Sequence, residues 1–280
     1  RQLMSHSGLT LLNNGNKLII IQIKGELDMY GKNIYLKSLK QQLSVEYSCS
    51  PGDFEKHYNI VTECSNSEGR RIYSAGAPFL QMATLGGNAV ITADISMHEW
   101  LKEFVKGKEG RSLFEYENLR EIDRELSKYD KKLRSTYHMF LPDGNYTEPE
   151  NLGLSIRWYK QDKLQQFYGS TEWKNALCSR FIPERPDMLA VTALDGDEIL
   201  AMAGCSADTG EMWQIGVDVV EYCRGKGPAT WLVTLLKIEI IKRGKIPFYG
   251  TSLSILYSWN TALKSGFFPA WVETVTVEKS

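Results

Sequence analysis

The segment from Met212 to Arg243 reads MWQIGVDVVEYCRGKGPATWLVTLLKIEIIKR and decides how this half of the chain folds. Met212 to Val220 is an apolar run of the kind that forms strands. The turn from Arg224 to Gly227 is rich in glycine, and an apolar helical pattern follows from Pro228 to Arg243, before Gly244. Proline at the first helical position and glycine just past the end are typical helix boundaries. The order strand, glycine-rich turn, helix predicts an α/β fold.

The glycine-rich turn also predicts a binding site for an anion. Glycines let the backbone approach a ligand closely, and the first free amides of a helix attract negative charge. Arg224 and Lys226 add positive charge at the same place. The arrangement suits a pyrophosphate, although its spacing matches neither a Walker A loop nor a dinucleotide-binding Gly-x-Gly-x-x-Gly fingerprint. A tight turn with a solvated lysine is the alternative interpretation.

The elements around this segment continue the same pattern. Met188 to Leu194 and Glu198 to Cys205 are joined by a loop that starts with Asp195 and Gly196, which predicts a β-hairpin. The other elements expected here are strands at 154–159, 246–254 and 271–277 and helices at 161–166, 171–178 and 257–264.

The first half of the chain reads as a mixed α/β domain whose role the sequence does not define. Its expected helices are 31–45, 115–133 and one opened by a capping box of Ser96 and Glu99, and its expected strands are 59–63, 71–74 and 88–92. Leu141 to Glu150 holds two prolines and an Asp-Gly, which predicts a linker. We therefore expect an N-terminal α/β domain of residues 1–143 and a second domain of residues 144–280.

Several short segments of the second half together resemble the GNAT acetyltransferase superfamily. Arg224-x-x-Gly227-x-Ala229 fits that family's acetyl-CoA signature, Gln/Arg-x-x-Gly-x-Gly/Ala, and Gly266-Phe267 fits the Gly-Phe that usually follows its last helix. The segments that carry the resemblance are 214–219, 221–229, 244–248 and 264–271. The resemblance is clear from about residue 211 to 273. It implies a mixed α+β sheet in which two central parallel strands, 212–220 and 246–254, splay apart.

The resemblance implies an acetyl-CoA-dependent N-acetyltransferase. A neutral primary amine of an unidentified acceptor would attack the thioester directly. The pantetheine would pair with the strand like an added strand, and the pyrophosphate would lie on the amides of the glycine-rich turn. The binding residues implied for acetyl-CoA are Ile215, Val217, Val219, Arg224, Gly225, Lys226, Gly227, Pro228 and Ala229.

Glu211 is the candidate general base. Alternation along the strand places it on the same face as Ile215, and some members of the family carry a base at this position. A solvated glutamate at the end of a strand is the alternative. Asp218 alternates to the other face and is expected to be structural, and Glu273 is a further acidic residue that could reach the cleft.

The acid that protonates the departing thiolate is less clear from the sequence. Many family members place a tyrosine where this chain has Ala262, and Ile255 stands where an asparagine is common. Ser258 and the adjacent Tyr257 are therefore the candidate residues for this step. The same departures favour a first alternative, a catalytically silent acyl-CoA-binding module. A second alternative is a tandem-type aminoacyl or acyl transferase with an RNA-carried donor, which would need a second GNAT-like half before Gly144 and a basic groove.

The composition of the chain limits the binding partners, metal sites and cellular location that we expect. With 33 basic and 34 acidic residues the net charge is -1, which argues against a nucleic acid partner held mainly through its phosphates. Five scattered cysteines without C-x-x-C spacing, and isolated histidines, predict no zinc or other metal site. No apolar stretch approaches membrane-spanning length, and the first residues, RQLMSHSG, predict no signal peptide. The expectation is a reduced, cytoplasmic protein that does not bind membranes, with a homodimer as the assembly considered.

Overall fold

The computed structural model describes residues 12–13, 18–19, 27–72 and 76–279 of the 280-residue chain. The elements up to residue 142 are β1 (Leu12–Asn13), β2 (Leu18–Ile19), α1 (Leu27–Glu46), β3 (Ile60–Glu63), β4 (Leu80–Thr84), β5 (Ala89–Ala93), α2 (His98–Phe104), α3 (Tyr116–Leu126), β6 (Lys131–Leu133) and β7 (Tyr137–Pro142). Those that follow are β8 (Ser155–Lys160), β9 (Asp187–Asp195), β10 (Glu198–Ala207), β11 (Met212–Val219), α4 (Pro228–Lys242), β12 (Ile246–Ser252), α5 (Leu256–Lys264) and β13 (Phe267–Glu278). Short 3₁₀ helices cover 51–55, 95–97, 110–114, 127–129, 161–167 and 221–223.

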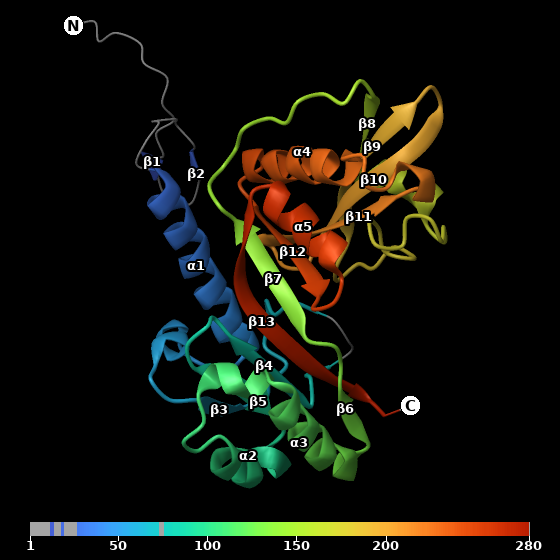
Figure 1. Cartoon of the computed structure of the whole chain (residues 1–280). Coiled ribbons are helices and arrows are strands. Elements are labelled where there is room, and N and C mark those ends of the chain that lie inside the picture. Colours follow the sequence, from blue (N-terminus) through green and yellow to red (C-terminus); the bar gives the residue numbers. More distant parts are fainter. Residues whose placement is uncertain (1–11, 14–17, 20–26, 73–75, 280) are drawn as a thin grey trace, which may run out of the picture.

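One mixed sheet runs through both halves of the chain. Its strand order is β3-β5-β4-β13-β7-β12-β11-β10-β9-β8, and β6 pairs with β13 beside this path. The expected mixed α/β class is therefore confirmed. In Figure 1 α4 and α5 lie together on the upper part of this sheet, and α2 and α3 lie at its lower end.

The last strand, β13, joins the two halves. Its segment 272–275 pairs with β4, and its segment 267–273 pairs with β7. β7 itself lies between β13 and β12, so a strand that precedes the expected boundary at residue 144 is flanked by two strands that follow it. The division of the chain into residues 1–143 and 144–280 stays a prediction.

The strands and helices near the glycine-rich turn match the sequence-based expectation closely. The hairpin of β9 and β10, the strand β11, the helices α4 and α5 and the strand β12 all lie within a few residues of the expected ranges. Buried side chains of α4, among them Leu232, Leu236 and Ile240, pack on the sheet together with Ile215 and Tyr249. This packing fixes the start of α4 relative to the strands beside it.

Several expectations were wrong in their details. The predicted helix 115–133 ends at Leu126, because Asp130 adopts a left-handed φ of 55° and the chain then enters β6, which pairs with β13. The helix α2 is not opened by a capping box at Ser96. Instead the carboxylate of Asp94 accepts a hydrogen bond from the Ser96 amide at 3.0 Å.

Three further segments differ from the prediction. The stretch 171–178 forms turns rather than a helix. Arg71 and Ile72 lie in no strand, and the rest of the predicted strand 71–74 lies outside the described residues. The strands β4 and β7 were not expected. The end of β7 overlaps the stretch from Leu141 to Glu150, whose two prolines predicted a linker.

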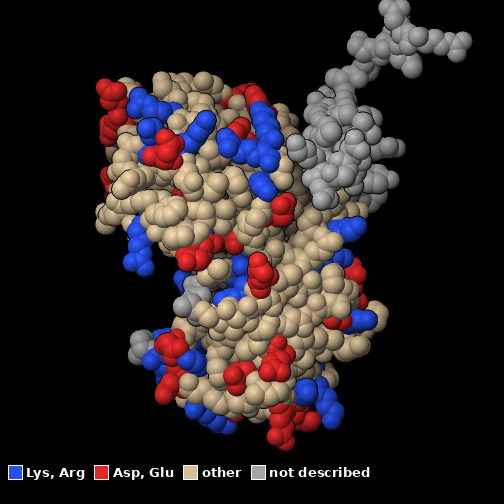
Figure 2. Space-filling view, turned by 180° about the vertical axis from the view of Figure 1, so that it is seen from behind, with Lys and Arg blue, Asp and Glu red and all other residues tan. Residues whose placement is uncertain are grey.

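Figure 2 shows basic and acidic side chains interspersed over the face that it presents, with both signs also in the hollow at the waist of the molecule. None of the helices in the described part of the chain combines the length and the apolar character needed to cross a membrane.

Candidate functional site

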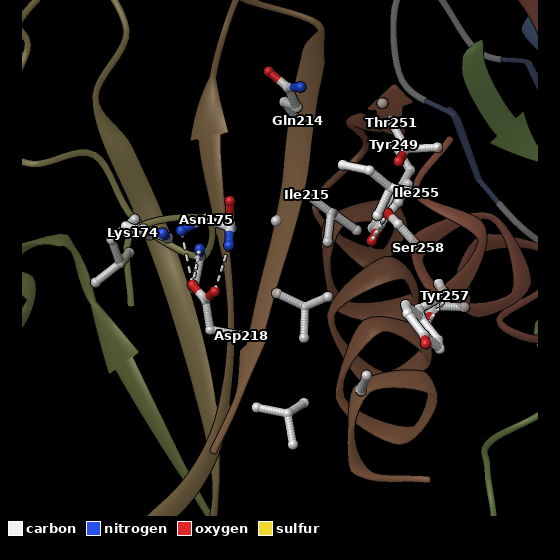
Figure 3. A pocket seen from close by; sticks show the side chains of 18 of the residues that line it. Lys174, Asn175, Gln214, Ile215, Asp218, Tyr249, Thr251, Ile255, Tyr257 and Ser258 are labelled. Carbon is white, nitrogen blue, oxygen red and sulfur yellow. Dashed lines mark hydrogen bonds between the residues drawn. The ribbon is translucent and has the colours of Figure 1, made fainter. Parts of the chain in front are cut away.

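The site begins where two parallel strands part. β11 pairs with β12 only from Met212 opposite Ile246 to Ile215 opposite Tyr249. Beyond that point β11 continues to Val219 and remains paired with β10 on its other side. Within the described part of the chain, no strand therefore pairs with the edge of β11 from 216 to 219 that faces β12. A cleft of about 1250 Å³ opens at this place, between β11 and the helices α4 and α5 (Figure 3).

The start of α4 forms one end of the cleft. Gly225 and Gly227 have φ angles of 78° and 101°, in the left-handed region that glycine adopts readily. The first helical hydrogen bond of α4 runs from the Trp231 amide to the Gly227 carbonyl at 3.1 Å. The amides of Ala229 and Thr230 precede that bond, so they belong to the free first turn of the helix, and both residues line the cleft. This geometry provides donors for an anion.

The turn-rich stretch 171–178 forms a wall of the cleft on the face of the sheet opposite α4. Asp218 holds it in place, because its carboxylate accepts hydrogen bonds from the Asn175 amide at 2.7 Å, the Asn175 side chain at 2.5 Å and the Ala176 amide at 2.8 Å (Figure 3). The loop lies so close to the strands that a Cβ on Gly216 would be 1.8 Å from the Asn175 carbonyl oxygen. A Cβ on Gly204 would be 2.2 Å from the Ala176 carbonyl oxygen. The structural role expected for Asp218 is therefore confirmed.

Tyr249 and Ser258 lie next to the point where the strands part. Their hydroxyls are 2.8 Å apart, and both residues line the cleft (Figure 3). Burial raises the pKa of Tyr249, and the hydrogen bond with Ser258 opposes that shift. The tyrosine therefore stays protonated and able to donate a proton over the neutral pH range. Tyr257, one residue before Ser258 in α5, also lines the cleft but is 87% exposed.

The carboxylates near the cleft differ in their availability. Asp187, Ser206 and Gln214 pair in one row across β9, β10 and β11, and all three line the cleft. Burial raises the pKa of Asp187, and a hydrogen bond from the Cys178 amide opposes the shift. Glu211 does not belong to this lining. It precedes the first residue of β11, and its exposed carboxylate accepts a hydrogen bond from the Lys245 ammonium at 3.2 Å.

Glu273 belongs to a buried ion cluster beside the cleft. Arg71 donates to the Glu273 carboxylate at 2.8 Å and to the Glu46 carboxylate at 2.7 Å. The guanidinium of Arg71 also lies 5.6 Å from the ring centre of Phe248 and 5.4 Å from that of Trp271. These contacts occupy Glu273, which leaves it a structural role in the cluster.

The structure brings most of the sequence-predicted residues together. The residues of that set which line the cleft are Ile215, Val217, Val219, Arg224, Gly225, Gly227, Pro228, Ala229, Tyr257 and Ser258. Lys226, which lies in the same turn, and Glu211 are not part of the lining.

Sequence reasoning missed part of the site. Asn175, Asp187, Gln214 and Tyr249 all line the cleft and were not singled out for it. The alternation of side chains along β11 could have identified Gln214, since it places Gln214 on the same face as Asp218. Asp187 and Asn175 carried no such signal, because their positions depend on pairing and loop contacts distant in sequence.

Comparisons with known proteins give a likeness of fold. No protein-family model and no curated protein matches the chain. Among solved structures, it is similar to a GCN5-related N-acetyltransferase-like protein from Streptococcus suis, with 17% identity and a TM-score of 0.42 over 57% of this chain and 68% of the other. It is also similar to an acetyltransferase of the GNAT family from Colwellia psychrerythraea, with 11% identity and a TM-score of 0.40 over 97% and 81%. A GCN5-related N-acetyltransferase from Kribbella flavida has 12% identity and a TM-score of 0.42 over 55% and 62%.

Proposed function

We propose that the protein is an acyltransferase that binds acetyl-CoA in the cleft and transfers its acetyl group to a primary amine. One observation carries the proposal. The open edge of β11, residues 216–219, leads from the parting of two parallel strands directly to the glycine-rich start of α4. An extended chain can add to an open strand edge through main-chain hydrogen bonds, and a pyrophosphate can bind at a helix N-terminus.

The residues that would hold acetyl-CoA follow from this path. The backbone of Ile215, Val217 and Val219 would pair with the pantetheine. The turn from Arg224 to Ala229 would hold the pyrophosphate with its amides, with Arg224 and the nearby Lys226 adding positive charge. The amine acceptor would enter from the opposite face, where Asn175, Gln214 and Asp187 lie.

Asp187 is the general base that we propose in place of Glu211, because it lines the cleft and Glu211 does not. Its raised pKa makes it a stronger base than an ordinary aspartate. The amine nitrogen would attack the thioester carbon, give up a proton toward Asp187, and release the thiolate as the carbon–sulfur bond breaks. Tyr249, hydrogen-bonded to Ser258, would then protonate the thiolate.

Calorimetric titration with acetyl-CoA tests the binding step. We expect binding by the parent chain and none by Gly227→Glu, because a carboxylate at the start of α4 would repel the pyrophosphate. An absence of binding by the parent chain would overturn the proposal. Free-thiol release with a panel of primary amines then separates an enzyme from a silent acyl-CoA-binding module, which would bind acetyl-CoA without turnover.

The pH dependence of the rate tests the base. Asp187→Asn should lower kcat/KM by about 10²- to 10⁴-fold and remove the acidic limb of the pH profile. Glu211→Gln serves as the comparison and should leave the profile unchanged. The opposite outcome would return the role to Glu211. The cytoplasmic location and the homodimer stay predictions.

A further inference from the structure

A second, smaller cavity opens beside the cleft. Its volume is about 170 Å³. It shares four lining residues with the cleft: Tyr137, Arg185, Gln214 and Gly250. Gln214 directly precedes Ile215, the last residue of β11 that pairs with β12. One residue that lines the small cavity therefore lies one position along β11 from the point where β11 and β12 part. The two cavities therefore adjoin through their shared lining residues.

Three arginines from separate segments line this small cavity: Arg71, Arg134 and Arg185. Arg71 is held by Glu46 and Glu273, so these two carboxylates already neutralise it. Arg134 lies with its guanidinium 5.7 Å from the ring centre of Tyr137. In the described part of the chain, no carboxylate forms an ion pair with Arg134.

Arg185 is the cation that both cavities share. Burial raises the pKa of Asp187 and of Asp208, and the nearby charge of Arg185 opposes both shifts. Burial has the largest effect on Asp208 and raises its pKa to about 6. A ligand anion placed between Arg134 and Arg185 would meet two guanidinium groups, which are the side chains best suited to bind a carboxylate or phosphate.

We propose that this small cavity binds an anionic group, a carboxylate or a phosphate, of the amine acceptor. The acceptor is then a short molecule with an amine at one end and a negative charge at the other. This inference rests on the proposed acyl transfer for the identity of the ligand as an acceptor. The arginines come from both sides of residue 144, so the first half of the chain selects the substrate of a reaction whose thioester lies in the second half.

The test uses three series of small amines. They are ω-aminocarboxylates with one to four methylene groups, the same amines with an uncharged carboxamide in place of the carboxylate, and the matching aminoalkyl phosphates. Binding is measured by calorimetry with the full chain, alone and saturated with CoA, and turnover by thiol release from acetyl-CoA. We expect the charged probes to bind about 10- to 100-fold more tightly than the amides, as for charge-assisted hydrogen bonds. The better of the carboxylate and phosphate series identifies the anion.

Arg134→Gln is the diagnostic variant, since Arg134 is exposed and its loss should not unfold the chain. It should raise KM for the charged acceptors about 10-fold or more, with kcat little changed and the weak binding of the amides unaffected. Arg157→Gln, on the exposed strand β8, is the matched control and should change nothing. The inference would be overturned if the probes with an anionic group and those with a carboxamide bound with equal affinity. It would also be overturned if Arg134→Gln and Arg157→Gln had equal effects. If acetyl-CoA itself does not bind, the proposed function fails, while the titration of the protein alone still decides whether the cavity binds an anion.

Discussion

Gly227 is the residue on which the start of α4 depends. Its φ of 101° lies where other residues are strained, while the nearest atom to an added Cβ is 3.6 Å away, on Leu152. Gly227→Ala should therefore lower the free energy of unfolding by about 1–2 kcal/mol through backbone strain rather than through a clash. Denaturant unfolding measures the change. Gly52→Ala is the control, because Gly52 has no positive φ and open space around it, and it should stay within about 0.5 kcal/mol of the parent. Equal losses in both variants would contradict the argument.

Lys237 is a buried cation in the middle of α4. Its ammonium donates to the Asn145 carbonyl at 2.6 Å and to the Gly266 carbonyl at 3.3 Å. Burial lowers its pKa to about 8, and the nearby Asp143 opposes this shift. Between about pH 8 and pH 10.5 the unfolded chain, with an ordinary lysine pKa, binds more protons at this site than the folded chain. Stability contributed by this site therefore rises with pH across that window.

Lys237→Met removes this pH dependence. The difference in unfolding free energy, parent minus variant, should become more favourable to the parent by up to about 1.4 kcal/mol per pH unit between pH 8 and pH 10.5. Denaturant titrations at several pH values give this difference. Lys242→Met, at an exposed position of the same helix, should run parallel to the parent. A curve for Lys237→Met that also runs parallel would show that Lys237 titrates normally in the folded protein.

Single residues were predictable where a local pattern places them. The glycine-rich turn correctly indicated that α4 starts after Gly227, and the alternation of β11 correctly indicated the face on which Asp218 lies. Glu211 shows the limit of such reasoning, because alternation gives the face of a strand but not where the strand begins or which cation lies nearby. Here Lys245, which is distant in sequence, binds the carboxylate outside the cleft.

At the scale of elements, the contact between β11 and the loop around Asn175 requires a glycine. Gly216→Ala would force the loop away, since the new Cβ would be 1.8 Å from the Asn175 carbonyl oxygen. We expect a loss of about 1–3 kcal/mol in unfolding free energy, typical of overpacking, and faster proteolysis within 174–186. Gly210→Ala, in the turn before β11, has open space and no positive φ, so it should leave both measurements unchanged. A stable Gly216→Ala with an intact loop would mean that the loop adjusts at little cost.

Helices and strands were predictable from the sequence where the periodicity of their own apolar residues determines the structure. The hairpin of β9 and β10 and the helix α4 are such cases. The predicted helix 115–133 was too long because its last residues pair with β13, a contact between positions more than 140 residues apart. The segment 171–178 forms turns rather than the predicted helix for a related reason, since the carboxylate of Asp218, distant in sequence, accepts hydrogen bonds from it.

At the scale of the whole molecule, Arg71 connects α1 to β13 through its two carboxylates. Arg71→Met would leave the buried Glu46 and the half-buried Glu273 without their cation and should cost about 3–5 kcal/mol in unfolding free energy. Adding Glu46→Gln and Glu273→Gln to that variant should recover part of the loss. Arg111→Met removes an exposed ion pair with Glu109 and should cost less than about 1 kcal/mol. Chemical denaturation compares the variants, and similar losses for Arg71→Met and Arg111→Met would contradict the role of the cluster.

The overall architecture was predictable only in its class. Composition and the strand–turn–helix order indicated a mixed α/β fold, which the structure has. Nothing local to β7 indicated that it would enter the middle of the sheet, because it ends at Pro142, the first of two prolines in a stretch typical of a linker. Its place depends on β12 and β13, which the chain supplies more than 100 residues later.

The position of β13 has a consequence for how the protein is made. Until its segment 272–275 arrives, the edge of β4 lacks the partner that it has in the finished sheet. During synthesis on the ribosome, the edge of β4 therefore stays unpaired by β13 until late. Such an open sheet edge is a template for pairing with other nascent chains. Chains that stop before this segment keep the unpaired edge of β4, and such truncated products of translation are the species that we expect chaperones to bind.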